Sequence, residues 1–177
     1  MSRVAKEKVC LNGVSCEKFD EFLILSNVAG KKLKIGLFGL GVSILDGIIS
    51  VNLTQKSNKS LAGTVIRNIR NAVNGLSKGV DIAIEMNGVG YKADLIGDKY
   101  LSLYIGLSHG VLVVIPSDIS VKVTSSTKIF LSSFNLNLVT AFAAYLKSMK
   151  KVEPYKAKGI IEVGDFVRRK EVKANKK

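Results

Sequence analysis

The feature that most limits how this chain can fold is a segment that recurs further along the sequence. A shift of 70 positions places residues 35–54 on residues 105–124 without a gap, with Ile-Gly-Leu opening both copies. The later copy has Pro116 where the first has Asp46, and proline suits a turn far better than the interior of a helix. Both copies are therefore predicted to form a strand, a turn and a strand.

The same shift also aligns two helical patterns. Apolar residues recur at spacings of three, four and three positions, which places them on one helix face that can cover a sheet. They are Ile66, Ile69, Val73 and Leu76 in the first pattern, and Leu136, Val139, Ala143 and Leu146 in the second. The shared face makes duplication a better explanation than chance similarity between apolar segments.

The repeat predicts an α+β fold of two tandem similar domains. Each is expected to be an antiparallel sheet with one packed helix, and a basic segment follows at the C-terminus. The domains are expected to cover residues 1–79 and 80–177, because glycines at positions 75 and 79 can end the first helix. Alternating apolar residues from Val80 to Met86 predict the first strand of the second domain.

Positive charge is concentrated near the C-terminal end. The chain has 27 lysines and arginines against 14 acids, a net charge of +13, and 11 of the basic residues lie in 147–177 beside four acids. Such a balance indicates a polyanionic partner, which can be nucleic acid, an anionic membrane surface or an acidic protein. A merely soluble basic domain stays open on charge alone. Clustering favours nucleic acid, since neutralising neighbouring phosphates releases counterions.

The residues around Pro154 carry a more specific pattern. Pro154 is expected to end the second helix, and Tyr155 offers a flat ring. Lys156 and Lys158 are expected to alternate along an extended piece. An aromatic ring among lysines suits RNA, where rings stack on unpaired bases or riboses. For residues 173–177 a disordered basic tail is an equally good interpretation.

Residues 35–53 are long and apolar enough to resemble a membrane-spanning segment, because they contain a single charged residue, Asp46. Four glycines and the turn-forming pair Asp46-Gly47 favour two short strands over a membrane-spanning helix. The charged N-terminus is not followed by an apolar run, so no signal peptide is expected.

Catalytic and metal-binding patterns were not found. Cys10 and Cys16 form no zinc framework, and no phosphate-binding loop occurs. Ser108 and His109 are neighbours, and adjacent residues of a strand point to opposite faces, so a nucleophile–base pair is not expected. His109 and Gly110 are expected in a hairpin turn. We therefore predict no enzyme, no cofactor, no metal site and no small-molecule substrate.

Five motifs stand in order along the chain. They are the opening Met1–Lys6, the segment Gly88–Ala93, the pair Ser108-His109, the stretch Glu153–Ile160 and the stretch Val167–Glu171. Together they resemble the L6 family of bacterial large-subunit ribosomal proteins over essentially the whole chain. The most specific match is Glu153–Ile160, which is similar to the family signature Pro-Glu-Pro-Tyr-Lys-Gly-Lys-Gly.

The resemblance implies a structural constituent of the large ribosomal subunit, located in the cytoplasm and bound to the ribosome. Family members bind large-subunit ribosomal RNA near the sarcin–ricin loop and the stalk base, where translational GTPases dock. Implied partners are that RNA, neighbouring large-subunit proteins and, transiently, the GTPases. Implied RNA-binding residues are Tyr155, Lys156, Lys158, Gly159, Arg168, Arg169 and Lys170, with Arg3 and Lys6 as further candidates.

The chain departs from the family at several positions. Ala157 replaces the first glycine of the Lys-Gly-Lys-Gly core, so either its methyl group alters the fit to RNA or the position needs no positive φ. Gly110 replaces a usual proline after Ser-His, and Ser132-Ser133-Phe134 replaces a common Gly-Ala-Asp. No departure removes a basic residue of the signature. The alternative function is a basic RNA-binding or chaperone-like module outside the ribosome.

Overall fold

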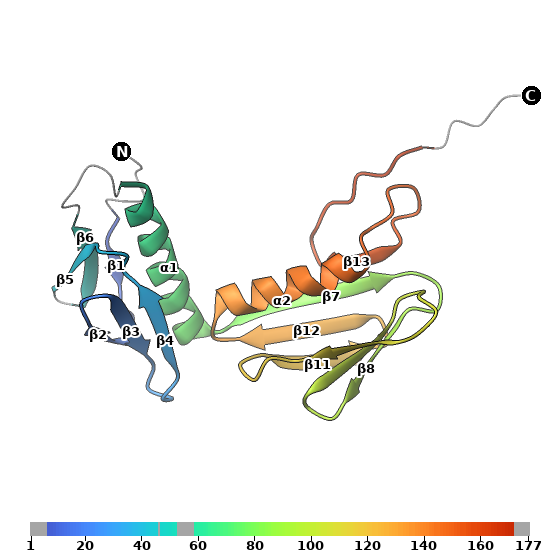
Figure 1. The fold of residues 1–177 in the computed structure, drawn as a ribbon, viewed down its shortest axis with the longest axis horizontal. Helices are drawn as coiled ribbons and strands as arrows, with labels where there is room; N and C mark the ends of the chain where they lie inside the picture. The colour runs from blue at the N-terminus through green and yellow to red at the C-terminus, as the bar shows by residue number, and fades with distance from the viewer. Residues whose placement is uncertain (1–6, 46, 53–58, 172–177) are drawn as a thin grey trace, which may run out of the picture. The chain divides into compact units, whose positions relative to one another are not determined.

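The computed structural model describes residues 7–45, 47–52 and 59–171, which form two compact units (Figure 1). The first unit ends at Gly79 and also includes Phe134–Leu136. The second comprises Val80–Ser133 and the chain from Asn137 onward.

The first unit combines two antiparallel three-stranded sheets with one helix, α1 (Lys59–Lys78). One sheet has the order β1-β6-β5 and the other the order β2-β3-β4. Gly79 follows the helix with φ +74° and donates its N–H to the Gly75 carbonyl at 2.9 Å, as expected for a glycine that ends a helix. The strands are β1 (Val9–Cys10), β2 (Ser15–Lys18), β3 (Phe22–Ser26), β4 (Lys32–Gly36), β5 (Gly41–Leu45) and β6 (Ile48–Asn52).

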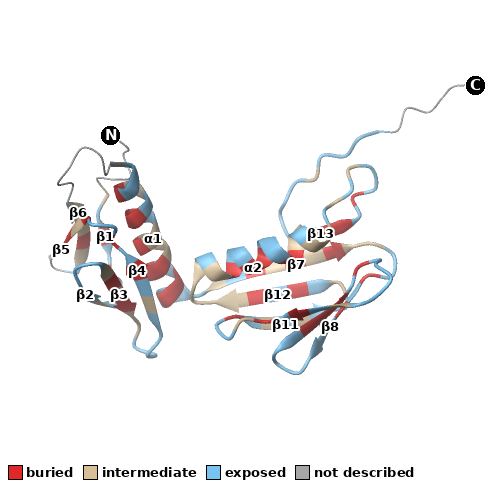
Figure 2. Cartoon of the chain, in the orientation of Figure 1, coloured by how far each residue is buried: buried red, intermediate tan, exposed pale blue. Residues whose placement is uncertain are grey.

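The second unit has the same plan with one more strand. Its sheets have the orders β10-β9-β8 and β11-β12-β7-β13, and its helix is α2 (Leu136–Met149). Val139, Phe142, Ala143 and Leu146 form the buried side of α2 (Figure 2). The strands are β7 (Val80–Asn87), β8 (Lys92–Ile96), β9 (Tyr100–Tyr104), β10 (Val111–Val114), β11 (Ser120–Ser125), β12 (Lys128–Ser133) and β13 (Gly159–Glu162).

The α+β class and the tandem similarity are confirmed, with two sheets in each unit instead of one. The segment considered as a membrane span contains the end of β4 and all of β5 and β6, with Gly47 at φ +71° between the last two. Asp46 lies outside the described residues. Among the residues that the structure describes, no helix is long and apolar enough to cross a membrane.

The repeat distance of 70 residues is wrong. Leu23 and Leu25, fully buried in β3, correspond to Leu101 and Leu103 in β9, which is a shift of 78 positions. A matching pair of backbone hydrogen bonds has the same shift. Leu37 N–H donates to Glu21 O at 2.9 Å, and Ile115 N–H donates to Lys99 O at 2.8 Å. The recurring Ile-Gly-Leu therefore aligns the end of β4 with the residues that follow β9, although the structural counterpart of β4 is β10.

The wrong shift was convincing because secondary structure is periodic. It differs from the structural one by eight positions in the strands, an even number that keeps inward and outward residues aligned. The helices correspond at a shift of 77, which pairs Ala62, Val65, Ile66 and Ile69 with the buried side of α2. A difference of seven residues is about two helical turns and preserves the buried face.

The sheet β10-β9-β8 has an outer face that is mostly apolar. Residues facing inward, such as Leu101 and Leu103, lie in the core. Antiparallel sheets usually present polar residues on the opposite side, yet Ile96, Tyr100 and Val114 are exposed and paired in one row across this sheet. The outward set is Lys92, Asp94, Ile96, Tyr100, Ser102, Tyr104, Leu112 and Val114.

Candidate nucleic-acid interface

The signature residues form a closed loop between α2 and β13. Ile160 N–H donates to Lys150 O at 3.1 Å, and Glu153 N–H donates to Lys158 O at 2.8 Å. The helix ends at Met149, so Pro154 does not terminate it but lies in a turn further on. Tyr155 and Lys156 share that turn, which replaces the extended piece expected from the sequence.

Two residues fix the shape of this loop. Ala157 has φ +53° and is 6% exposed, and its N–H donates to Glu153 O at 2.9 Å. The position therefore does need a positive φ, which explains why glycine suits it. Gly159 has φ +148°, and a Cβ there would lie 2.7 Å from the Cα of Val152. Gly159 is thus required by close packing of the loop on itself, and it is buried, whereas Lys156 and Lys158 are exposed.

The second predicted segment returns to the loop. Lys170 N–H donates to the Pro154 carbonyl at 2.9 Å, which ties residues 168–170 to the turn. Tyr155, half exposed, and the charged side chains of both segments face solvent. We call this set the basic surface; it consists of Tyr155, Lys156, Lys158, Arg168, Arg169 and Lys170.

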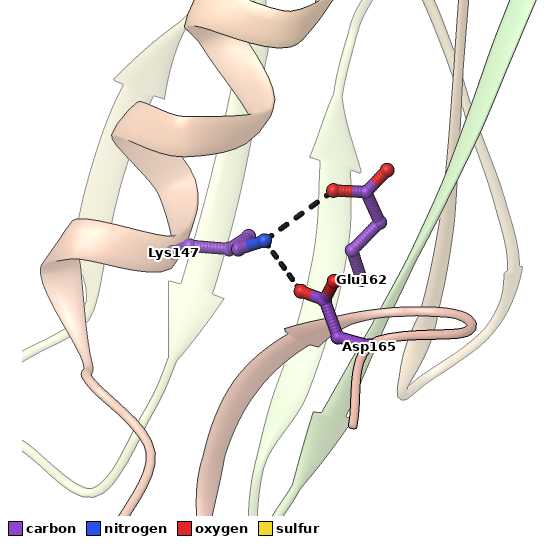
Figure 3. A network of polar contacts seen from close by, with 3 residues as sticks. All are labelled: Lys147, Glu162 and Asp165. Atoms are coloured by element: carbon purple, nitrogen blue, oxygen red, sulfur yellow. Dashed lines mark hydrogen bonds and ion pairs between the residues drawn. The ribbon is translucent and has the colours of Figure 1, made fainter. Parts of the chain in front are cut away.

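A three-residue ion cluster anchors the chain between the two segments (Figure 3). Lys147, in the last turn of α2, places its Nζ 2.6 Å from Asp165 Oδ2 and 3.3 Å from Glu162 Oε2. Its hydrogen bond with Asp165 raises the pKa of Lys147, and the same bond lowers the pKa of the Asp165 carboxyl. Lys147 and Asp165 are therefore both charged at neutral pH.

The cluster engages two of the four acids in the C-terminal segment, Glu162 and Asp165, with one lysine, so its formal net charge is −1. Within the described part of the chain, the cations of the basic surface make no ion pair with an acid. Positive charge therefore dominates the solvent side of both segments.

Two features of this site were not predicted from the sequence. The first is the ion cluster, because an i, i+15 and i, i+18 relation carries no recognisable spacing. The second is Phe166, which is 92% exposed. It lies two residues before the basic run Arg168–Lys170, and an aromatic residue next to such a run was a signal that could have identified it. Arg3, Lys6 and residues 173–177 lie outside the described residues.

Ser108 and His109 differ from the expectation for a strand. Both lie in the bend between β9 and β10, and Ser108 Oγ is 3.3 Å from His109 Nδ1. They can therefore contact each other, because the opposite orientation of neighbours applies only within a strand. Both are exposed, and within the part of the chain that the structure describes no hydrogen bond to a carboxylate orients the ring as a nucleophile–base pair needs.

Metal-ligand side chains do not gather in the described residues: no group of three or more histidines, cysteines or acids could hold an ion. Cys10 and Cys16 are free thiols. Burial, followed by the charge of Glu17, raises the pKa of Cys16, so this cysteine is less reactive than an ordinary one.

Comparison with known proteins agrees with these motifs. The family described as Ribosomal protein L6 matches residues 87–163, which include the signature loop. The large ribosomal subunit protein uL6c of Guillardia theta is 37% identical over 180 residues, covering 100% of both chains. The uL6 of Streptococcus suis is 46% identical over 122 residues, which are 69% of this chain and 68% of that protein. The uL6 of Streptococcus agalactiae is 36% identical over 179 residues, 99% of this chain.

Proteins named uL6 match this chain over all or nearly all of its length, and the family match covers residues 87–163, which contain the signature loop. The chain therefore belongs to the ribosomal protein L6 family, whose members are structural, non-enzymatic proteins of the large ribosomal subunit.

Proposed function

We propose that the basic surface binds large-subunit ribosomal RNA near the sarcin–ricin loop and the stalk base, where translational GTPases dock. The observation that carries this proposal is the hydrogen bond from Lys170 N–H to Pro154 O. It joins two segments that are a dozen residues apart into one positively charged surface. The location on the RNA, and with it the proximity of GTPases, rests on the resemblance of the signature to the family.

The chemistry of the surface suits structured RNA. Lysines contact phosphates as point charges, while the guanidinium groups of Arg168 and Arg169 can form paired hydrogen bonds to phosphate oxygens. Tyr155 can stack on a ribose or an unpaired base. Such contacts position the RNA backbone, and the folded second unit holds them in place.

The proposal is tested by binding the full chain to a large-subunit RNA fragment that contains the sarcin–ricin loop, across a series of salt concentrations. Lys156→Glu combined with Lys158→Glu should weaken binding and flatten the plot of log affinity against log salt. Loss of two phosphate contacts reduces the slope by roughly 1.5. Lys92→Glu with Lys122→Glu is the matched control, because both lysines are exposed on strands of the same unit.

The control pair changes the net charge by the same amount away from the basic surface, so it should leave most of the slope intact. An unchanged slope in the Lys156/Lys158 variant, or an equal loss in the control, would exclude this surface. Hydroxyl-radical footprinting of the complex tests the location separately: protection should include the sarcin–ricin loop. Retention on large subunits through a high-salt wash distinguishes a ribosomal constituent from an RNA-binding module that acts elsewhere.

A further inference from the structure

Phe166 has an environment that folding alone does not explain. Its side chain is 92% exposed, although a phenylalanine ring gains free energy when it leaves water. Val28 and Val89 are comparably exposed, but neither is aromatic, and both lie in turns outside the basic surface. Among the described residues, Phe166 is the aromatic side chain most open to solvent.

The backbone around Phe166 is anchored on both sides. Asp165, directly before it, is bound to Lys147 at 2.6 Å and donates its N–H to Glu162 O at 3.0 Å. Lys170, four residues after it, donates its N–H to Pro154 O. The ring is therefore presented from a segment held at two points, which lowers the entropy lost when a partner orders it.

The charges near Phe166 select the class of partner. Arg168, Arg169 and Lys170 follow the ring, while the adjacent carboxylate of Asp165 is paired with Lys147. The three cations outnumber the single net negative charge of the ion cluster, so the region of the ring attracts a polyanion. An apolar protein surface would instead have to desolvate three cations.

We infer that Phe166 is a stacking platform for one unpaired nucleobase of the RNA that the basic surface binds. This inference rests on the function proposed above and adds a base contact to its phosphate contacts. Stacking on an aromatic face is tolerant of base identity, so Phe166 contributes affinity and register more than sequence selectivity.

The test uses the full chain and the same RNA fragment. Phe166→Ala should weaken binding by about 5- to 150-fold, the range for loss of one base–aromatic stack. Phe166→Tyr, which keeps the ring, should bind as the unaltered chain does, and Phe166→Leu should bind clearly more weakly. The salt slope should stay unchanged in all three, since no phosphate contact is removed. Val163→Ala is the control, because Val163 is an exposed apolar residue of the same segment.

The inference is overturned if Phe166→Ala binds as the unaltered chain does, or if Phe166→Leu matches Phe166→Tyr, which would indicate an apolar contact without stacking. A loss equal to that of Val163→Ala also overturns it. In those cases the salt-dependent binding and the effect of the Lys156/Lys158 variant persist, so the proposed function survives. If the unaltered chain shows no salt-dependent binding, the proposed function and this inference fail together.

Discussion

At the scale of single residues, the signature loop depends on two positions in the left-handed region of backbone space. Ala157 occupies it with a side chain, at a strain of about 1 kcal/mol. Its methyl group is buried, and burial of one such group contributes about 0.8 kcal/mol. The two effects nearly cancel, which explains how alanine can stand where the family has glycine.

Gly159 offers no such compensation. Gly159→Ala should destabilise the second unit by at least about 2 kcal/mol, because the new Cβ would meet backbone atoms of Val152 and Lys151 that cannot move separately. Calorimetric unfolding measures this loss. Gly164→Ala is the control: its φ is +102°, but nothing lies within 4 Å of an added Cβ, so strain alone acts there. Equal losses at both positions would contradict the packing argument.

The sequence could identify the signature residues but not their conformation. Resemblance selected Tyr155, Lys156 and Lys158 because these residue types stand at the same places in the family signature. The turn at Pro154 and the positive φ of Ala157 arise from hydrogen bonds to Glu153 and Lys158, which depend on how the loop closes. Local residue pattern contains no information on that closure.

At the scale of elements, the ion cluster links the end of α2 to the chain that follows β13. Asp165→Asn should lower RNA affinity about two- to fivefold, because the cluster holds the segment that carries Phe166 and Arg168 and exposed ion pairs contribute up to about 1 kcal/mol. Charge alone predicts the opposite, since the substitution makes the chain more positive. Glu171→Gln adds the same charge at an exposed acid outside the cluster, and should raise affinity. A gain in affinity for Asp165→Asn would show that the cluster does not position the segment.

The cluster should also respond to pH in a defined direction. The folded-state pKa of Asp165 lies below its ordinary value of 3.8, so its contribution to stability is full above that value and is lost as pH falls through the folded-state pKa. The raised pKa of Lys147 removes the contribution only in strongly alkaline solution. Lys147→Met should bring the pKa of Asp165 back toward 3.8, as measured by NMR titration of its carboxyl carbon. An unaltered titration curve would contradict the contact.

Helices and strands were predictable as types because their periods are short. The same periodicity hid the correct repeat distance, since a shift of seven or eight residues leaves buried faces aligned. The equivalence of β3 and β9 in the two units is evident only from matching hydrogen bonds, such as those donated by Leu37 and Ile115.

At the scale of the molecule, the mostly apolar outer face of sheet β10-β9-β8 should promote self-association of the chain in free solution. Its edge strand β10 carries no charge, and exposed apolar edges promote association. Leu112→Lys should reduce concentration-dependent self-association, measured by sedimentation velocity, without loss of stability, since Leu112 is exposed. Lys34, at the equivalent position in the first unit, provides the converse variant, Lys34→Leu, which should increase association. No change in either variant would show that these faces do not mediate contact.

The uneven charge that the sequence revealed is a property of the whole molecule and needed no structure. The contact between its two basic segments could not be predicted from the sequence. Pro154 and Lys170 meet there through a backbone hydrogen bond, whose atoms are the same in every residue type that can form it. The tandem plan was predicted from a repeat whose spacing was wrong, and the second sheet of each unit was not predicted.

One difference between the units bears on how such chains can vary. A single glycine, Gly79, joins α1 to β7, whereas nine residues, 150–158, join α2 to β13. The first joint leads from one unit into the next, whereas the second returns the chain to the sheet of its own unit and is closed by the hydrogen bond from Ile160 N–H to Lys150 O. A peptide of another length or composition can be spliced into that joint while both hydrogen-bond ladders stay as they are. Contacts with a changing RNA surface can therefore be remodelled there without rebuilding the core.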